Sequence, residues 1–177
     1  MKTQIISLHT LEASTWSGGK TYQYYITPES AQYANRNFLY RISSATIDIA
    51  ESQFTQFEGY NRYLVMLDND LNIKHNGITK SFKPLEVFSF YSEDDIISYS
   101  KGSDFNLMVS RVHDHTKIRI ASGVLDRTAT TTLLFALSDC TLTIHNKEHF
   151  IKEKDLIILD EKTTSLLLPT DFIIMEW

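Results

Sequence analysis

The sequence is poor in cysteine, proline and glycine: its 177 residues include one Cys, three Pro and six Gly. Because Cys140 is the only cysteine, an internal disulfide and a cysteine-only metal site are both excluded. This usage suits a reducing compartment, so we expect a cytoplasmic protein. A chain of this length can bury roughly 70% of its unfolded surface, which is enough for a core without disulfides or a structural metal.

Long hydrophobic runs and basic clusters are also missing. Apolar stretches such as 156–159 and 165–168 are far shorter than a bilayer span. No secretory signal is recognisable either, so we expect no membrane association. Seventeen Lys and Arg stand against 22 Asp and Glu, for a net charge of -5, and no basic cluster could follow a phosphate backbone. Nucleic acid is therefore disfavoured as a partner.

Short stretches of alternating apolar and polar residues recur along the whole chain, and no stretch shows a sustained helical period. The pattern predicts about fourteen short strands, separated by turn residues. Asn76-Gly77 is the strongest of these turns, and Asp68-Asn69-Asp70 also predicts a hairpin. Closure into barrels would remove exposed strand edges, so we predict an all-β protein of two small fused barrels, 1–112 and 113–177, with a loose boundary.

Two arginines at predicted strand starts are the main candidates for a binding site. In a strand over 41–48, alternation places Arg41 and Ser43 on one face with apolar neighbours. Arg62 follows the turn at Gly59 and precedes a buried strand at 63–67. Two guanidinium groups flanked by aromatic residues indicate a site for a small anion. The alternative is that each arginine pairs with a surface carboxylate or extends into solvent.

The segment 104–108 adds further polar candidates. Its alternation places Asp104, Asn106 and Met108 on one face of a strand. Asn106 offers both a donor and an acceptor, so on a barrel wall it could complete the hydrogen bonds of a polar ligand; the alternative is that it braces a turn. For Asp104 we expect a turn brace, or a partner that orients an arginine.

The sequence holds no strong pattern for a metal or a nucleophile. His113 and His115 have a spacing that a strand would place on one face, but no glutamate follows at the usual distance and no later histidine has a matching context. Cys140 lies in an alternation typical of a buried thiol, and no Gly-x-Ser-x-Gly motif occurs. We therefore predict no bound metal, no cofactor and no catalytic residue, and we favour a protein that is not an enzyme.

Four blocks in order resemble the HutD/Ves family: WSGGKT at 16–21, RISSA at 41–45, FTQFEGYNR at 54–62 and DFNLM at 104–108. The resemblance covers about residues 16–111 and implies the fold of that family, a bicupin of two cupin-like β-barrels. Where the family usually reads Gly-Pro-Phe-Ser, this chain has SQFT at 52–55, so the turn before Phe54 is expected to differ.

The resemblance also implies a function. HutD members are linked to histidine utilisation, where they are thought to sense or bind urocanate, formiminoglutamate or formylglutamate, whereas the Ves branch is tied to stress response. We predict a non-catalytic sensor or regulator that binds a small polar or anionic metabolite at the mouth of the first barrel. The expected ligand-binding residues are Arg41, Ser43, Arg62, Asn106, Phe54 and Trp16.

Two other functions are consistent with the sequence. A cupin-type enzyme, such as an isomerase acting on a small carbonyl compound or sugar, is the first. The second is a scaffold whose barrel is filled by its own aromatic residues, since the chain has nine Tyr and ten Phe. The sequence leaves a homodimer open.

Overall fold

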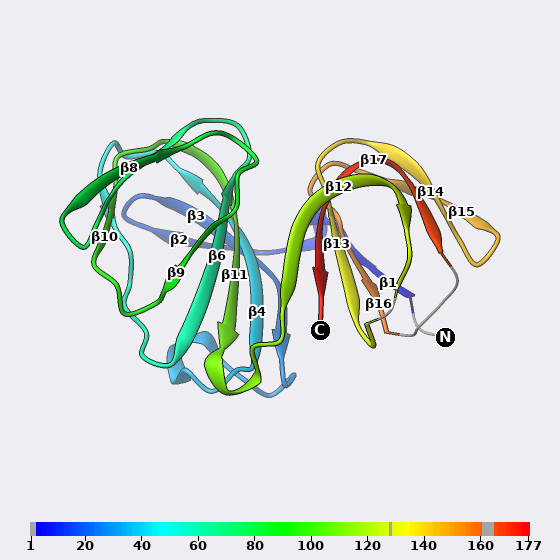
Figure 1. Ribbon diagram of the computed structural model, residues 1–177, viewed down its shortest axis with the longest axis horizontal. Coiled ribbons are helices and arrows are strands. Elements are labelled where there is room, and N and C mark those ends of the chain that lie inside the picture. Colours follow the sequence, from blue (N-terminus) through cyan, green and yellow to red (C-terminus); the bar gives the residue numbers. More distant parts are fainter. Residues whose placement is uncertain (1–2, 128, 161–164) are drawn as a thin grey trace. The chain divides into compact units, whose positions relative to one another are not determined.

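The computed structural model describes residues 3–127, 129–160 and 165–177, and its regular elements are strands and three short 3-10 turns (Figure 1). The all-β prediction is therefore confirmed. The turns are η1 (Leu8–Thr10), η2 (Tyr33–Asn35) and η3 (Arg111–His113). The strands are β1 (Thr3–Ile6), β2 (Ala13–Trp16), β3 (Gly19–Thr27), β4 (Tyr40–Ile47), β5 (Ser52–Gln53), β6 (Tyr60–Met66), β7 (Leu71–His75), β8 (Ile78–Phe82), β9 (Phe88–Tyr91), β10 (Ile96–Ser98), β11 (Gly102–Ser110), β12 (Lys117–Leu125), β13 (Thr132–Ala136), β14 (Cys140–Ile144), β15 (Lys147–Ile151), β16 (Leu156–Leu159) and β17 (Leu166–Glu176).

The chain divides into two compact units, which we call the N-terminal unit (Leu11–Asp114) and the C-terminal unit (Met1–Thr10 with His115–Trp177). The first strand thus belongs with the end of the chain, whereas the predicted division at 112 grouped it with the residues that follow it. Strand β1 pairs antiparallel with β16 along its whole length. This pairing covers an edge of β16 that would otherwise be open, which explains the placement.

The N-terminal unit contains a six-stranded sheet in the order β2-β3-β4-β11-β6-β9 and a four-stranded sheet in the order β5-β10-β7-β8. The predicted Asn76-Gly77 hairpin is confirmed, because β7 and β8 pair across it and both residues have positive φ, 48° and 85°. The predicted hairpin at 68–70 is wrong, since β6 and β7 lie in different sheets. There the Asp68 carboxylate accepts hydrogen bonds from the Ser103 N–H, which ties the segment after β6 to β11, its neighbour in the same six-stranded sheet.

The C-terminal unit contains a five-stranded sheet in the order β1-β16-β13-β17-β12 and the hairpin β14-β15. Strand β17 is continuous over 11 residues, whereas the alternation in the sequence predicts two separate strands, at 165–168 and at 172–177. Pro169 falls where the pairing with β12 shifts register, between Ala121 and Gly123, so the strand continues without a ladder hydrogen bond from this residue. The core cluster of this unit is formed mainly by leucine and isoleucine.

Within the described residues, the strand orders of the sheets are open, and none of them closes on itself. In the same part of the chain, no helix has the length and hydrophobicity needed to cross a membrane.

Candidate functional site

The inward face of the six-stranded sheet carries two buried arginines in one row. Arg41 on β4 and Arg62 on β6 both lie opposite Met108 on β11, and residues directly opposite in antiparallel strands share a face. Arg41 is 7% and Arg62 is 9% exposed. The next row pairs Ser43 with Asn106, both also buried. The structure therefore brings four of the predicted site residues together on one surface.

This face is otherwise apolar. One core cluster includes Ile47, Leu64 and Phe90, and the last two lie in the two rows themselves. Another includes Phe38, Phe57, Tyr60 and Met108. The arginines are thus embedded in the core of the N-terminal unit, where the prediction that they extend into solvent does not apply.

Arg41 is held by polar neighbours on β3 and β4. Its Nε donates to Gln23 Oε1 at 2.8 Å and its Nη1 donates to Ser43 Oγ at 3.1 Å. Its guanidinium lies 4.1 Å from the centroid of the Tyr33 ring, a cation-π contact. A β-bulge between Gln23 and Tyr25 sets the register that places Gln23 opposite Ser43. Gln23 and Tyr33 are exposed, so Arg41 adjoins solvent-exposed side chains.

Arg62 has weaker polar contacts than Arg41. Its Nε donates to Asn106 Oδ1 at 3.4 Å and its Nη1 to the Thr55 carbonyl at 3.5 Å, both longer than ordinary N–H···O bonds. The rings of Phe54 and Phe90 each lie 5.1 Å from the guanidinium carbon. Phe54, a predicted site residue, therefore joins the site through a cation-π contact. Among the described residues, neither Arg62 nor Arg41 forms an ion pair with a carboxylate.

Asp104 is the carboxylate on the same face of β11, and it is 6% exposed. Its Oδ1 accepts a hydrogen bond of 2.9 Å from the Ala45 N–H, so it braces strand β4, whereas the sequence predicts a turn brace or a partner that orients an arginine. Burial raises the pKa of Asp104 to about 6, although both arginines act in the opposite direction. Burial also lowers the pKa of Arg62 to about 10 and lowers that of Arg41. With all three groups ionised, the site has one net positive charge.

Trp16 lies apart from the arginines. It pairs with Gly19 on β3, and Gly19 pairs with Ile47 at the opposite end of β4 from Arg41. Ile47 lies six residue steps along the strand from Arg41, a distance of about 20 Å. Trp16 is 38% exposed, and its ring occupies the space that a side chain at Gly18 would need. The structure therefore gives the WSGG segment a packing role.

Three site neighbours were not identified from the sequence: Gln23, Tyr33 and Phe90. Gln23 lies in a segment predicted as a strand, but only the bulge determines its partner. Tyr33 lies in a polar segment without periodicity, so no sequence signal indicates its contact with Arg41. Phe90 could have been found as a regular inward position of its strand, since it lies opposite Arg62.

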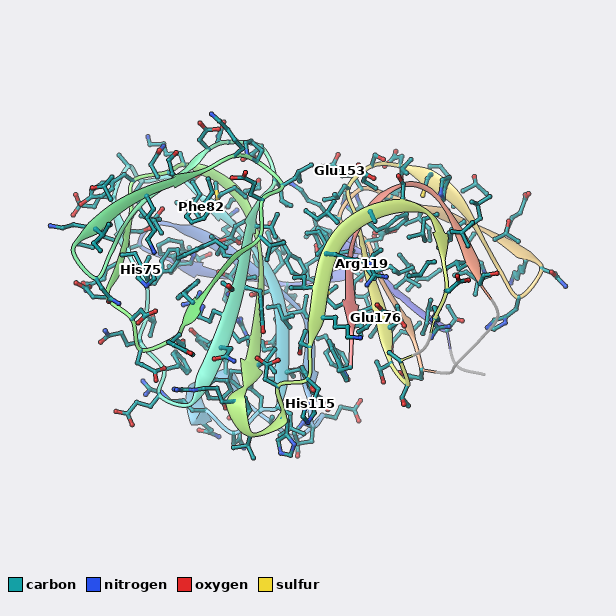
Figure 2. The ribbon with its side chains drawn as sticks, viewed as in Figure 1. His75, Phe82, His115, Arg119, Glu153 and Glu176 are labelled. Atoms are coloured by element: carbon teal, nitrogen blue, oxygen red, sulfur yellow. The ribbon has the colours of Figure 1, made fainter. Side chains whose placement is uncertain are left out.

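In the C-terminal unit, the charged pair Arg119 and Glu176 provides a contrast. Arg119 on β12 and the buried Glu176 on β17 form an ion pair, and Figure 2 shows both labelled beside each other. The Glu176 carboxylate is thus paired with a guanidinium group. Arg41 and Arg62 of the N-terminal unit, in contrast, form no ion pair with a carboxylate among the described residues.

Among the described residues, the histidines do not belong to any cluster that could hold a metal ion. His113 belongs to the 3-10 turn η3 and His115 follows it, so the two do not share a strand face as their spacing predicted. Asp114 between them accepts hydrogen bonds from Asn61 and the Tyr63 hydroxyl. Burial, and then the contact with Asp114, raise the pKa of Tyr63. No group of three His, Cys, Asp or Glu in the described part of the chain could hold a metal ion.

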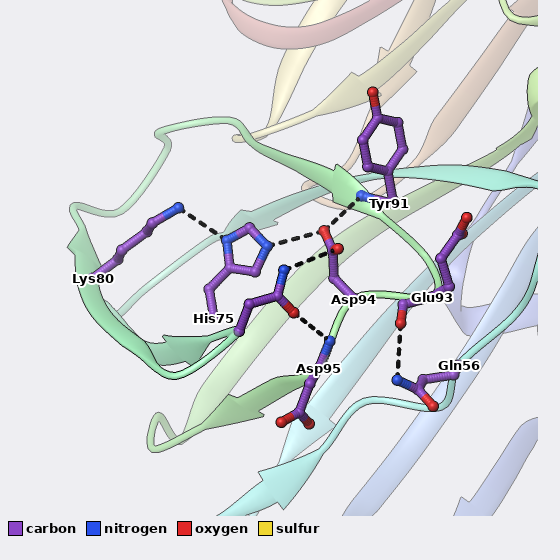
Figure 3. Close-up of polar contacts among 8 residues, drawn as sticks. Gln56, His75, Lys80, Tyr91, Glu93, Asp94 and Asp95 are labelled. Atoms are coloured by element: carbon purple, nitrogen blue, oxygen red, sulfur yellow. Dashed lines mark hydrogen bonds and ion pairs between the residues drawn. The ribbon is translucent and has the colours of Figure 1, made fainter.

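His75 is also engaged in a local network (Figure 3). Its Nε2 lies 2.9 Å from Asp94 Oδ2, and its Nδ1 lies 2.9 Å from Lys80 Nζ. Asn76 donates to the other oxygen of Asp94, which ties the β7-β8 hairpin to the segment before β10. Because both ring nitrogens have hydrogen-bond partners, we assign His75 a structural role in this sheet.

We expect protein purified without chelator to contain no stoichiometric transition metal, because the described histidines and carboxylates do not converge. Elemental analysis of the purified protein measures this directly. One equivalent of Fe, Mn, Ni or Zn that is lost in a His113→Ala, His115→Ala variant would contradict the prediction.

Comparison with known proteins agrees with the fold. The structure of HutD from Pseudomonas fluorescens SBW25, solved in a formate condition, is 20% identical in sequence and has a TM-score of 0.83. The match covers 99% of this chain and 97% of the HutD chain. A conserved protein of unknown function from Pseudomonas aeruginosa PAO1 is 18% identical over 99% and 97%, with a TM-score of 0.80. A cupin 2 conserved barrel domain protein from Leptotrichia buccalis is 10% identical over 97% and 94%, with a TM-score of 0.61.

A search of curated proteins found no match. The profile of the HutD family matches residues 8–174, which is nearly the whole chain and extends well past the blocks that carried the resemblance. Together with the cupin-like neighbours, this match settles the classification: the chain belongs to the HutD family and has an all-β, cupin-like fold.

Proposed function

We propose that this protein is a non-catalytic binding protein for a small carboxylate, which Arg41 and Arg62 hold on the inward face of the N-terminal unit. The observation that carries the proposal is the pair of buried guanidinium groups in one row, without an ion-paired carboxylate among the described residues. Desolvating two cations is costly unless an anion compensates them.

The geometry around the arginines supports an anionic ligand. Arg62 uses its Nε and Nη1 only in long contacts of 3.4 and 3.5 Å, so a carboxylate would offer these donors better acceptors. Arg41 is oriented by Gln23 and Ser43, and aromatic rings lie near both guanidinium groups. Such preorganisation lowers the entropic cost of binding. Ser43 and Asn106 remain as polar neighbours for other groups of the ligand.

Membership of the HutD family gives the candidate ligands. We propose an intermediate of histidine degradation, with urocanate, formiminoglutamate and formylglutamate as the compounds to test, and a role as a sensor or regulator. All three carry a carboxylate. We also propose that each unit is a cupin-like barrel, which would place the arginine row inside the first barrel.

A thermal-shift screen tests the proposal. Formate, as the smallest carboxylate, and the three intermediates are each added to the full chain and the melting temperature is measured. A ligand at a hundred times its Kd stabilises the native state by about 2.7 kcal/mol, which for a chain of this size is a rise of roughly 5–10 °C.

The matched control is the same compound with its carboxylates converted to amides, which should give no shift. If none of the carboxylates raises the melting temperature, or if the amides raise it equally, the proposed function is wrong.

A further inference from the structure

Asp104 lies on the same surface as the two arginines but contacts neither through a hydrogen bond among the described residues. It alternates along β11 with Asn106 and Met108, and Met108 lies between Arg41 and Arg62. Its one described hydrogen bond comes from the backbone of Ala45. Its carboxylate therefore adjoins the proposed site, is almost fully buried and forms no ion pair among the described residues.

The charged groups around Asp104 come from three elements. Arg41 on β4 and Arg62 on β6 favour its ionised form, and Asp68, in the turn after β6, opposes it. In the buried region the balance is two guanidinium groups against one carboxylate. The site has one net positive charge when Asp104 is ionised and two when it is protonated.

We infer that Asp104 determines the charge of the ligand: with Asp104 ionised the two-arginine site accepts a monocarboxylate, and a dicarboxylate binds with uptake of one proton by Asp104. The inference rests on the proposed function and names the ligand class of the same site. Its physical basis is that a buried region tolerates little net charge, so the ligand and Asp104 together balance the arginines. The proton comes from solvent and remains on the Asp104 carboxyl, so the two guanidinium charges balance the two carboxylates of the bound ligand.

The direction of the pH dependence follows from the buried position of this carboxyl. Burial raises the pKa of Asp104 from 3.8 to about 6, so the free protein populates both forms around that pH. A second negative charge on the ligand disfavours the ionised form and raises this pKa further. By linkage, affinity for a dicarboxylate rises as the pH falls toward 6, and affinity for a monocarboxylate depends less on pH.

The test compares N-formylglutamate, a dianion, with N-formylglutamine, a monoanion of nearly the same shape. The carboxyl groups of both ionise below about pH 5, so at pH 6 and pH 8 only the protein titrates. Isothermal titration calorimetry on the full chain measures both Kd values at each pH. We expect the preference for the dianion to increase about tenfold or more between pH 8 and pH 6. Titrations at pH 8 in two buffers of different ionisation enthalpy should show uptake of about one proton per dianion.

Asp104→Asn is the matched variant, because the amide oxygen can still accept the Ala45 N–H. It should prefer the dianion at both pH values, without proton uptake. If this variant does not fold, the dianion preference of the wild type at pH 6 and pH 8 still tests the inference. A wild-type preference that is equal at both pH values, or a pH dependence that persists in Asp104→Asn, would overturn the inference and leave the proposed function intact. Failure of both compounds to bind the wild type at either pH would count against both proposals.

Discussion

Arg62→Met should weaken binding of N-formylglutamate by about a hundredfold or more, while the protein remains folded. Arg62 is buried between Phe54 and Phe90, and its donors make only long contacts within the chain. A hydrogen bond to a charged group contributes about 1.5–3 kcal/mol, so the loss of two such bonds removes at least two powers of ten in affinity. Calorimetric titration measures the change.

The fold should tolerate this substitution because the methionine side chain is apolar and lies among core residues. Replacing a desolvated cation by a residue of similar length removes a burial penalty. We expect Arg41→Lys, which keeps the charge but loses the planar donors to Gln23 and Ser43, to weaken binding by a smaller factor, about tenfold.

Arg111→Met is the control for a general effect of charge. Arg111 lies in the same unit, and its ion pair with Glu93 is exposed, so its removal should leave affinity nearly unchanged. If Arg62→Met and Arg111→Met bind N-formylglutamate equally well, the arginine row is not the binding site.

Gly19→Ala should lower the free energy of unfolding by about 3 kcal/mol or more. Gly19 has a φ of +153°, and a Cβ at this position would lie 1.8 Å from the Thr46 carbonyl oxygen. The φ angle of Gly19 and the position of the Thr46 carbonyl are both fixed by the pairing of β3 with β4. Neither can change without breaking this pairing. Equilibrium unfolding in urea measures the loss.

Gly77→Ala separates the two causes. Gly77 also has positive φ, +85°, but no atom lies within 4 Å of its Cβ position. Only backbone strain is expected there, about 1–2 kcal/mol. Equal losses in the two variants would show that the close approach of Thr46 is unimportant. A larger loss for Gly19→Ala would establish that the paired glycines of the WSGG segment serve strand packing.

The arginine row has a consequence for how the family motifs are understood. The RISSA, FTQFEGYNR and DFNLM blocks lie on β4, β6, β11 and the segment before β6, and together they supply Arg41, Ser43, Phe54, Arg62 and Asn106. The WSGGKT block lies at the other end of the sheet. The RISSA, FTQFEGYNR and DFNLM blocks thus supply the proposed site, whereas the WSGGKT block forms the edge of the sheet.

The sequence by itself determined the local features of this protein. Alternation with a period of two predicted the strands, and it correctly placed Arg41 and Ser43 on one face and Asp104 and Asn106 on another strand's face. Asn76-Gly77 predicted its hairpin because the two residues tolerate the positive φ that the turn requires. Such features depend on a few adjacent residues, so they can be recognised from a short stretch of sequence.

Only the tertiary structure decided which strands meet. Pairing of β4 and β6 with the distant β11 brought Arg41 and Arg62 into one row, and pairing of β1 with β16 joined the two ends of the chain. The bulge in β3 placed Gln23, and the exposed Trp16 was found far from the arginines. These outcomes depend on sheet register over long sequence separations, where many pairings satisfy the same local alternation and packing of the whole unit selects one.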